Sequence, residues 1–425
     1  MSLLGKVFRK NNNENIFVQV VSYRDPELPH TLRNLVSNAS KPENLRICVI
    51  NQFSKKDNID LSEFKGNIFQ IYDFHYKKSR GVCWARNQAN QKYSGEKYTL
   101  QIDSHQRFIK NWDTELINMY NQVKTENNKV ILSTYPSSYN PKNDPHERNP
   151  YNWAIKFDKH TEEGIPTFKP MPITNPNEIT EPFLSRYLAG SFLFTEGRFV
   201  RDVPYDPNLY FEGEEISLSV RAYTNGYDIY SPHKLITWHY YLRENDPKHW
   251  DDNPEWEGAA FSSIDRIKKL LSIDGKVCTP CMQKGMGVYY LGKKRTLRQY
   301  EEFSGFHFRS RGVDQYTVKG NLPPNPVIER FDEHYMPQQS WNIKIHRKLI
   351  ENQGENFDFV SLILQDENHY DVYRIDFDSS FIKTMLEDKN EILDINGHYN
   401  GRPYKYWVLW PHKNKWLQKL EGIKI

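Results

Sequence analysis

Runs of apolar residues that each end in a polar loop predict the first buried strands of this chain. Residues 16–21 alternate and then become continuously apolar, and residues 45–50 and 98–102 are similar β-rich runs. A polar loop, residues 22–26, follows the first run. Residues from about 15 to 107 alternate between strand-like and helix-like patterns, which is typical of an α/β sheet. Because ligands bind outside the carboxyl ends of strands in such sheets, these polar loops are the first candidates for a binding site.

The middle of the chain contains further amphipathic helices and short strands. A helix over residues 216–223 is predicted by its apolar positions and by the helix stop Asn225-Gly226. Two strand-like segments follow, at 228–230 and 235–239. Further helices are expected at residues 112–123, 258–271 and 291–303.

Composition divides the chain into a large N-terminal and a small C-terminal part. Residues 1–310 hold the α/β pattern, interrupted at 133–182 by a segment rich in Pro, Asn and Ser that is too long for a simple connection, so we interpret it as an insert or lid. Residues 311–330 include a Pro-rich stretch and are predicted to be a linker. Residues 331–425 are predicted to form a small β-rich accessory domain, with strands at 341–347, 357–364, 370–377 and 404–410.

Charge and cysteine content narrow the class of protein. The net charge is +3 and no Lys/Arg stripe with interleaved aromatic residues is visible, so we expect no nucleic-acid partner. Aromatic residues make up 14% of the chain, which suits a protein that stacks sugars on its rings. The pair Cys278 and Cys281 could bind a metal or cycle between thiol and disulfide. Without a second pair, two reduced thiols are the favoured interpretation.

The most informative chemical motif is Asp103-Ser104-His105, at the end of the strand-like run 98–102. Residues two apart on an extended backbone point to the same side, so a carboxylate and an imidazole can share one ion. A hard oxygen with a borderline nitrogen suits Mn²⁺ or a similar divalent ion. Taken alone, the triplet is better explained as a loop-capping aspartate beside a surface histidine.

Two later segments support the ion-binding interpretation. His239 ends the second short strand and is free to complete a metal shell, although an isolated histidine is more often an ordinary hydrogen-bonded side chain. Glu214 and Glu215 open the helix before it, where the simplest role of acidic residues is to stabilise the helix dipole. Together these residues make the Asp103 and His105 pair a candidate metal site.

These motifs, taken in order, resemble one enzyme family. Asp103-Ser104-His105, residues 213–221 and His239 are similar to the Asp-x-His, Gly-Glu-Asn/Glu and distant-His motifs of the retaining GT-A glycosyltransferases that build mucin-type O-glycans. More closely, the chain resembles the N-acetylglucosaminyltransferases that modify hydroxyproline on a cytoplasmic ubiquitin-ligase subunit, and their bacterial relatives. The resemblance covers about the first three quarters of the chain, in the blocks 20–28, 80–86, 188–192 and 292–305.

The resemblance implies a GT-A domain over residues 1–310, in which we interpret the insert 133–182 as an acceptor-side lid. It implies a UDP-sugar donor and a bound Mn²⁺ or Mg²⁺ ion, held by Asp103, His105 and His239. Arg80 and Arg86 can pair with the diphosphate or with Asp103, and a surface salt bridge is the alternative for each. The expected donor-binding residues are Ser22, Tyr23, Arg24, Arg80, Arg86, Asp103, Ser104, Gly190 and Ser191.

We therefore expect metal-dependent transfer of a sugar, GlcNAc by analogy, to a hydroxyl of a protein or glycan acceptor, with retention of configuration. Glu214 would orient acceptor or donor hydroxyls. If the enzyme inverts, Glu214 or Glu215 becomes the general base. The alternatives are an inverting transferase for capsule or lipopolysaccharide glycans, a glycan-binding GT-A protein without turnover, and a metal-dependent hydrolase.

The expected location follows from what the sequence does not contain. No signal peptide opens the chain and no apolar run reaches the length of a membrane span, so a cytoplasmic protein is expected. Peripheral contact with a membrane-borne acceptor stays open. The accessory domain could bind acceptor glycan, mediate self-association or brace the larger domain.

Overall fold

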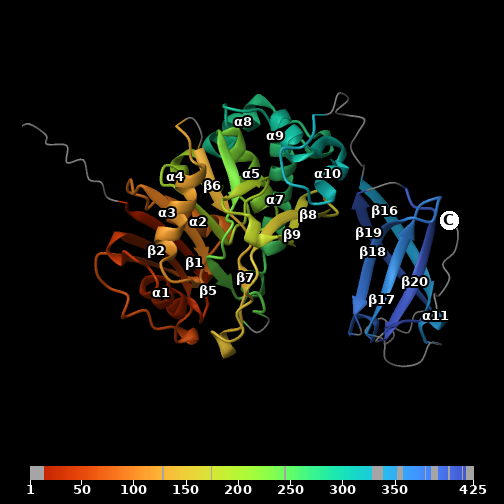
Figure 1. Ribbon diagram of the computed structural model, residues 1–425, viewed down its shortest axis with the longest axis horizontal. Helices are drawn as coiled ribbons and strands as arrows, with labels where there is room; N and C mark the ends of the chain where they lie inside the picture. The colour runs from red at the N-terminus through yellow and green to blue at the C-terminus, as the bar shows by residue number, and fades with distance from the viewer. Residues whose placement is uncertain are drawn as a thin grey trace, which may run out of the picture.

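An eight-stranded mixed sheet forms the centre of the larger, N-terminal part of the molecule (Figure 1). The computed structural model describes residues 14–126, 129–173, 175–243, 246–327, 338–351, 358–378, 380–383, 391–400, 403–413 and 415–417. The strand order is β10-β12-β6-β11-β4-β1-β2-β3. The strands are β1 (Ile16–Tyr23), β2 (Leu45–Phe53), β3 (Phe69–His75), β4 (Tyr98–Asp103), β6 (Lys129–Ser133), β10 (Phe183–Ser185), β11 (Phe192–Glu196) and β12 (Tyr227–Ser231).

Strand direction places the polar loops together. β1, β2, β3 and β4 are parallel, and β11 enters antiparallel between β4 and β6. In the pairing of β1 with β4, Val21 lies opposite Asp103. The loop after β1 and the motif at the end of β4 therefore share one edge of the sheet. The predicted α/β fold is confirmed.

Alternating residues of the strands pack against helices on both faces. Val18 and Val20 belong to a core with α1 (Leu28–Ser37) and α3 (Trp112–Val123). Phe17 and Val21 belong to a second core with α2 (Val82–Asn90). A third core is built around the later helices α5 (Glu214–Thr224), α7 (Trp256–Leu271) and α9 (Leu297–Ser304).

A small three-stranded sheet lies beside the large one. It contains β5 (Gln106–Phe108), β13 (Thr237–His239) and β7 (Ser137–Ser138), in the order β5-β13-β7. His239 lies opposite Gln106 in the antiparallel pairing of β13 with β5. The predicted insert 133–182 contains β7 and the hairpin of β8 (Trp153–His160) with β9 (Pro166–Pro172). The other short elements are α4 (Phe199–Asp202), α6 (His249–Asp252), α8 (Pro280–Met286), β14 (Phe306–His307), β15 (Gly312–Val313) and α10 (Gln315–Val318).

The C-terminal strands, blue in Figure 1, form two antiparallel sheets around a separate core that includes Trp341 and Leu362. They comprise β16 (Gln338–His346), β17 (Phe359–Gln365), β18 (Asp371–Asp378), β19 (Ile392–Asn400), β20 (Tyr406–Lys413) and β21 (Lys415–Trp416), with α11 (Arg347–Glu351). Asn400 contacts the larger part through His160 Nδ1, 2.7 Å from Asn400 Oδ1. The division at residues 311–330 stays a prediction, and part of that linker lies outside the described residues.

Several predicted element boundaries lie two or more residues from the observed ones, among them those of α9 and β13. The helix predicted from residue 291 begins only at Leu297, because Thr296 and Gln299 form a reciprocal capping box there. Gly292 lies against the end of α5, where an added Cβ would be 2.4 Å from the Thr224 carbonyl oxygen. The strand predicted from residue 235 begins at Thr237. β19 was not predicted, because polar residues interrupt its alternation.

The central sheet should be sensitive to loss of apolar volume at Leu100. This side chain is fully buried and lies opposite Val18 of β1 and Phe194 of β11. We expect Leu100→Ala to lower the free energy of unfolding by about 2–5 kcal/mol, measured by denaturant titration. Leu322→Ala, at a residue that is 43% exposed, is the control. A Leu100→Ala loss no larger than that of the control would contradict this packing.

Candidate active site

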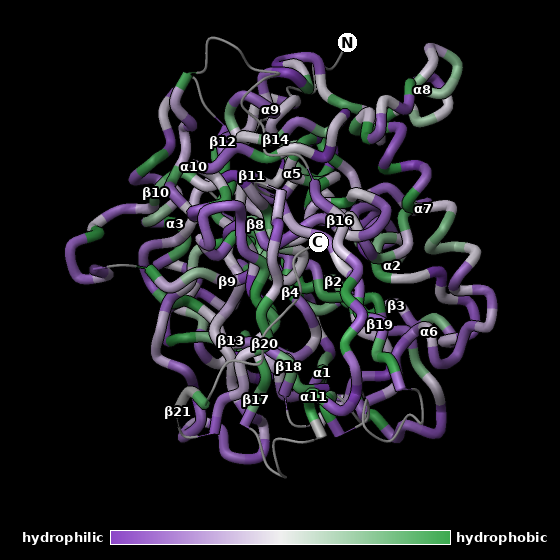
Figure 2. Tube along the Cα trace, turned by 90° about the vertical axis from the view of Figure 1, so that its right-hand side faces the viewer, coloured by the Kyte–Doolittle hydropathy of each residue, from purple (hydrophilic) through white to green (hydrophobic). Residues whose placement is uncertain are grey.

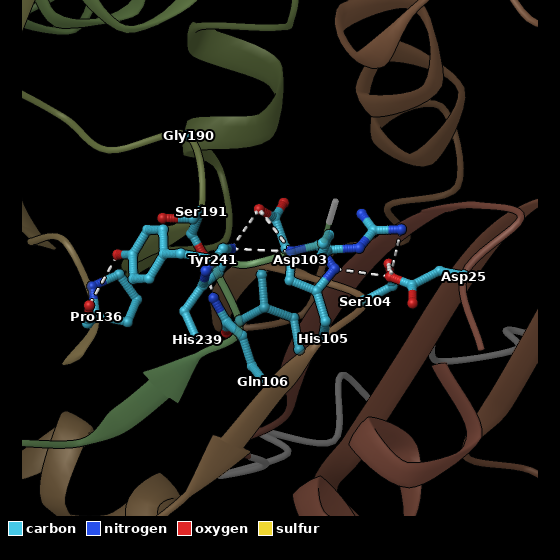
Figure 3. A network of polar contacts seen from close by, with 12 residues as sticks. Asp25, Asp103, Ser104, His105, Gln106, Pro136, Gly190, Ser191, His239 and Tyr241 are labelled. Atoms are coloured by element: carbon cyan, nitrogen blue, oxygen red, sulfur yellow. Dashed lines mark hydrogen bonds and ion pairs between the residues drawn. The ribbon is translucent and has the colours of Figure 1, made fainter. Parts of the chain in front are cut away.

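Three candidate ligands converge at the carboxyl end of β4. The Nε2 atoms of His105 and His239 are 3.0 Å apart, and His239 Nε2 is 3.2 Å from Asp103 Oδ2. One ligand atom from each residue lies within 4.8 Å of the others. Figure 3 shows the three side chains pointing toward one another. The chain thus brings His239 to a motif 136 residues earlier.

Strand pairing explains this convergence. His239 pairs with Gln106, the residue after His105, and Tyr240 N donates to the His105 carbonyl oxygen at 3.0 Å. Asp103 is the last residue of β4, and the chain turns at Ser104 and His105 into β5. The large sheet therefore positions Asp103, the small sheet positions His239, and His105 lies in the turn that joins them.

Asp25 contacts the ring nitrogen of His105 that faces away from the other two candidate ligands. The His105 Nδ1 atom is 2.7 Å from Asp25 Oδ2, which also accepts a hydrogen bond from the Ser104 hydroxyl at 2.5 Å. Burial opposes ionisation of Asp25, but His105 and the Arg243 guanidinium outweigh it and hold the pKa of this carboxyl below its usual range. A carboxylate on the far nitrogen of a histidine fixes its tautomer and leaves the other nitrogen for a metal. The sequence offered only a weak signal for this role, an aspartate in the loop after β1.

Arg86 supports Asp103 from the other side. Its Nη2 atom is 2.5 Å from Asp103 Oδ1, and its Nη1 atom donates to the Ile102 carbonyl oxygen at 2.7 Å. Burial raises the pKa of Asp103, but the hydrogen bond with His239 and the charge of Arg86 outweigh it, so the net pKa is lowered. Of the two predicted pairings for Arg86, the structure shows the one with Asp103. Arg80 is exposed beside Gly81.

The donor set fits a divalent cation. One carboxylate oxygen and two imidazole nitrogens are the mixture that Mn²⁺ accepts. Burial, followed by the charge of His105, lowers the pKa of His239 to about 4, so its ring is neutral near neutral pH. Within the described ranges this is the only such group of three or more His, Cys, Asp or Glu residues. Cys278 and Cys281 belong to no comparable group there and are free thiols.

Two cavities meet at the ligand group. The first has a volume of ≈ 290 Å³ and is lined by residues that include Tyr23, Gln52, His249 and Trp250. The second has a volume of ≈ 570 Å³ and reaches Phe168 of the insert. The residues common to both linings are Val82, Asp103, Phe211, His239 and Tyr241. A ligand that crosses from one cavity to the other must pass the candidate metal site.

The loop after β1 contributes unequally to the first cavity. Tyr23 lines it, and its hydroxyl donates to Asp252 Oδ2 at 2.8 Å. Ser22 is buried, and its carbonyl oxygen accepts a hydrogen bond from the Gln52 side chain at 2.9 Å. Arg24 lies outside both linings, because its guanidinium pairs with Asp57 at 2.7 Å and Asp252 at 2.8 Å.

Gly190 and Ser191 line the second cavity. Gly190 N donates to Glu215 Oε1 at 2.9 Å, and an added Cβ at this position would be 2.9 Å from Glu214 Oε1. The Ser191 carbonyl oxygen accepts a hydrogen bond from the Gln106 side chain at 2.7 Å. A side chain at position 190 would therefore displace the Glu214 carboxylate.

The glutamates at the start of α5 line the second cavity; Glu214 is buried and Glu215 is half-buried. The Tyr205 hydroxyl donates to Glu214 Oε1 at 2.8 Å, and the Tyr135 hydroxyl donates to Glu215 Oε2 at 2.5 Å. Burial raises the pKa of Glu214 above its usual range. Burial also raises the pKa of Glu215 to about 7, although its hydrogen bonds from Tyr135 and Gly190 act in the opposite direction.

Sequence reasoning missed several residues that shape the site. Besides Asp25, these are Tyr135, Tyr205, Tyr241, Arg243, His249 and Trp250. Tyr241 packs on His239, with ring centroids 4.2 Å apart, and its hydroxyl donates to the Pro136 carbonyl oxygen at 2.8 Å (Figure 3). Tyr241 to Trp250 follow His239 closely along the chain, and this proximity was the available signal.

A family model decides the classification. The model described as "Glycosyltransferase (GlcNAc)" matches residues 15–67 and 60–310, which is more than half of the chain. The chain belongs to this family. The matched residues include Asp25, the three candidate ligands and both glutamates at the start of α5, so the GT-A-like α/β part of the chain carries the site. No curated protein matches the chain.

Solved structures with similar folds are distant. A crystal structure of GalNAc-T7 with UDP, GalNAc and Mn²⁺ has 14% identity and a TM-score of 0.49, and covers 72% of this chain; the chain spans only 60% of that one. S. aureus TarS 1-349 in complex with UDP-GlcNAc has 13% identity and a TM-score of 0.37, covering 56% of this chain and 61% of that one. The mannosyltransferase PcManGT from Pyrobaculum calidifontis, with GDP-Man and Mn²⁺, has 11% identity and a TM-score of 0.37, covering 59% and 70%.

Among the described residues, no helix combines the length and the apolar character that spanning a membrane requires.

Glu215 should make stability depend on pH. Burial raises the pKa of its carboxyl from an ordinary value of 4.5 to about 7 in the folded chain. Between pH 4.5 and about 7 the folded state therefore binds one proton more than the unfolded state does at this group. Stability from this group is then fully present below pH 4.5 and is lost as the pH rises through about 7. Over this pH range the free energy of unfolding of the unmodified chain should fall by up to ~3 kcal/mol because of Glu215. We expect this fall to be absent in Glu215→Gln, as measured by denaturant titration at each pH.

The exposed Glu257 of α7 provides the control, because Glu257→Gln removes the same charge from a solvated position. Its pH profile of unfolding should match that of the unmodified chain. An unchanged profile for Glu215→Gln would show that Glu215 does not titrate in this range.

Proposed function

We propose that this chain transfers a sugar, GlcNAc by family analogy, from a UDP-sugar to a hydroxyl group of a protein or glycan acceptor, with the help of Mn²⁺ or Mg²⁺. One observation carries the proposal: Asp103, His105 and His239 converge where two cavities meet. A nucleotide sugar has two parts joined by a diphosphate, and this arrangement offers a place for each. The family match supports sugar transfer as the chemistry.

Each cavity has side chains suited to one part of the donor. The first cavity offers the aromatic rings of Tyr23, His249 and Trp250 for a nucleoside. The second offers Gly190, Ser191 and the carboxylates of α5 for a sugar and the incoming acceptor. A divalent ion held by the three ligands would neutralise negative charge on the departing diphosphate.

The chain's own groups prepare the reacting ends. Asp25 and Arg86 fix the orientation of His105 and Asp103 through hydrogen bonds. Tyr205 holds Glu214 in place, so that this carboxylate can accept a hydrogen bond from a donor or acceptor hydroxyl. Phe168 and Tyr241 contribute aromatic walls to the second cavity.

Retention of configuration is part of the proposal. Both oxygens of Glu215 already accept a hydrogen bond, from Gly190 N and from the Tyr135 hydroxyl. This favours a role in holding the site over removal of a proton from the acceptor. The pKa of about 7 at Glu215 favours the second candidate, an inverting reaction with Glu215 as general base. NMR of the product anomer separates the two.

Removal of His239 tests the proposed reaction. We expect His239→Ala to lower Mn²⁺-dependent UDP release from UDP-GlcNAc by at least about 100-fold, because one of three ligands is lost. His30→Ala, at an exposed position of α1, should retain full activity. Full activity of His239→Ala would refute the ligand assignment, and UDP release that no acceptor accelerates would favour a hydrolase.

Asp25 provides a test with the metal alone. We expect Asp25→Asn to weaken Mn²⁺ binding about 10–100-fold in isothermal titration calorimetry, because His105 loses its orienting carboxylate. Asp60→Asn, in an exposed loop, should bind Mn²⁺ like the unmodified chain. Equal affinities of the two variants, with native circular dichroism, would contradict the role of Asp25.

A further inference from the structure

A cationic segment with exposed apolar side chains lies far along the chain from the ligand group. Residues 275–300 contain six Lys or Arg residues and no Asp or Glu. Within this segment Val277 is 72% exposed, Met282 39% and Val288 68%. In Figure 2, α8 stands out from the body of the molecule, and both Figures 1 and 2 show α8 and α9 at the same end. We call residues 275–300 the basic segment.

Only part of the positive charge of the basic segment is neutralised. Lys276 pairs with Asp265, Arg295 with Asp228 and Arg298 with Glu302. In the described part of the chain, Lys284, Lys293 and Lys294 are exposed and form no ion pair. Lys284 lies four residues before Val288, and Lys293 five residues after it. Free cations and exposed apolar groups therefore alternate along one short stretch.

We propose that the basic segment docks the protein on an anionic lipid bilayer. Lysine side chains near an anionic leaflet gain electrostatic energy, and small apolar side chains that enter the headgroup region gain burial. A solvated surface of an ordinary domain carries charges of both signs, whereas the basic segment carries one sign. Its core-facing residues, Cys278 and Met286, are buried and anchor it to the body of the molecule.

This proposal goes beyond sugar transfer and does not depend on it. The basic segment contains none of the candidate ligands and lines neither cavity at the metal site. Vesicle binding can therefore be measured on the full chain without donor, metal or acceptor. Failure of one proposal leaves the other standing.

Vesicle sedimentation tests the electrostatic part. We expect the full chain to sediment with vesicles of phosphatidylcholine containing about one quarter phosphatidylglycerol, and to stay in solution with phosphatidylcholine alone. Replacing Lys284, Lys293 and Lys294 by Gln should lower the partition coefficient at least about tenfold. The matched control replaces three exposed lysines elsewhere, Lys56, Lys65 and Lys142, by Gln, which changes the net charge equally.

Cys281 allows a test of whether the apolar side chains of the basic segment enter the bilayer. It is exposed on α8, while Cys48, Cys83 and Cys278 are buried, so a polarity-sensitive thiol dye will label this position selectively. We expect the dye emission to shift to the blue with the anionic vesicles and to stay unchanged with the neutral ones. Val277→Ser with Val288→Ser should reduce the shift.

Three outcomes would overturn the proposal. They are no sedimentation with anionic vesicles, an equal loss in the matched control variant, and sedimentation without any change in dye emission. If the chain does not sediment with anionic vesicles, an acidic protein surface becomes the partner to test. If the control variant loses binding equally, the binding depends on net charge and not on the basic segment.

Discussion

The pairing of β13 with β5 is the constraint on which the candidate site depends. It sets His239 opposite Gln106 and so places two imidazoles edge to face, with ring centroids 4.4 Å apart. A slip of one residue in this short pairing would turn His239 to the other face of the strand. Neither strand has more than three residues, so neighbouring contacts must hold the register. Tyr240 N on the His105 carbonyl oxygen and Thr237 Oγ1 on the Arg107 carbonyl oxygen supply two such bonds.

Charge balance is the second condition of the site. Ionised carboxylates are costly to bury unless they are paired. Asp25, which is fully buried, lies 2.7 Å from His105 Nδ1 and pairs with Arg243, and Asp103 pairs with Arg86. Glu214 and Glu215 have no such cation in direct contact among the described residues, and burial raises the pKa of each. The site therefore separates ionised carboxylates at the ligand group from more easily protonated ones at the second cavity.

The pattern of apolar and polar residues predicted one helix and three strands of the larger part well. The limits of α3 follow from its amphipathic spacing, and β1, β2 and β4 follow from continuous apolar runs. The motif of Asp103 and His105 was visible because two ligands lie two residues apart. β19 was not predicted, because about half of its residues are polar. The start of α9 was predicted too early, because Gly292 packs against Thr224 and the chain there is not helical.

Long-range contacts could not be derived from spacing. Asp25 is recognisable as the partner of His105 only when β1 and β4 are known to be neighbours, since 80 residues separate the two. Arg24 shows the reverse case. It lies in the expected loop, but Asp57 and Asp252 take up its guanidinium from distant segments. Residue type and position indicated the edge of the sheet at which the cavities lie. Which side chains line the cavities depends on tertiary contacts.

Anomalous diffraction from crystals soaked in Mn²⁺ tests the central claim most directly. We expect one strong anomalous peak within coordination distance of Asp103, His105 and His239 together, at the junction of the two cavities. A peak at another position, or none at these three side chains, would contradict it.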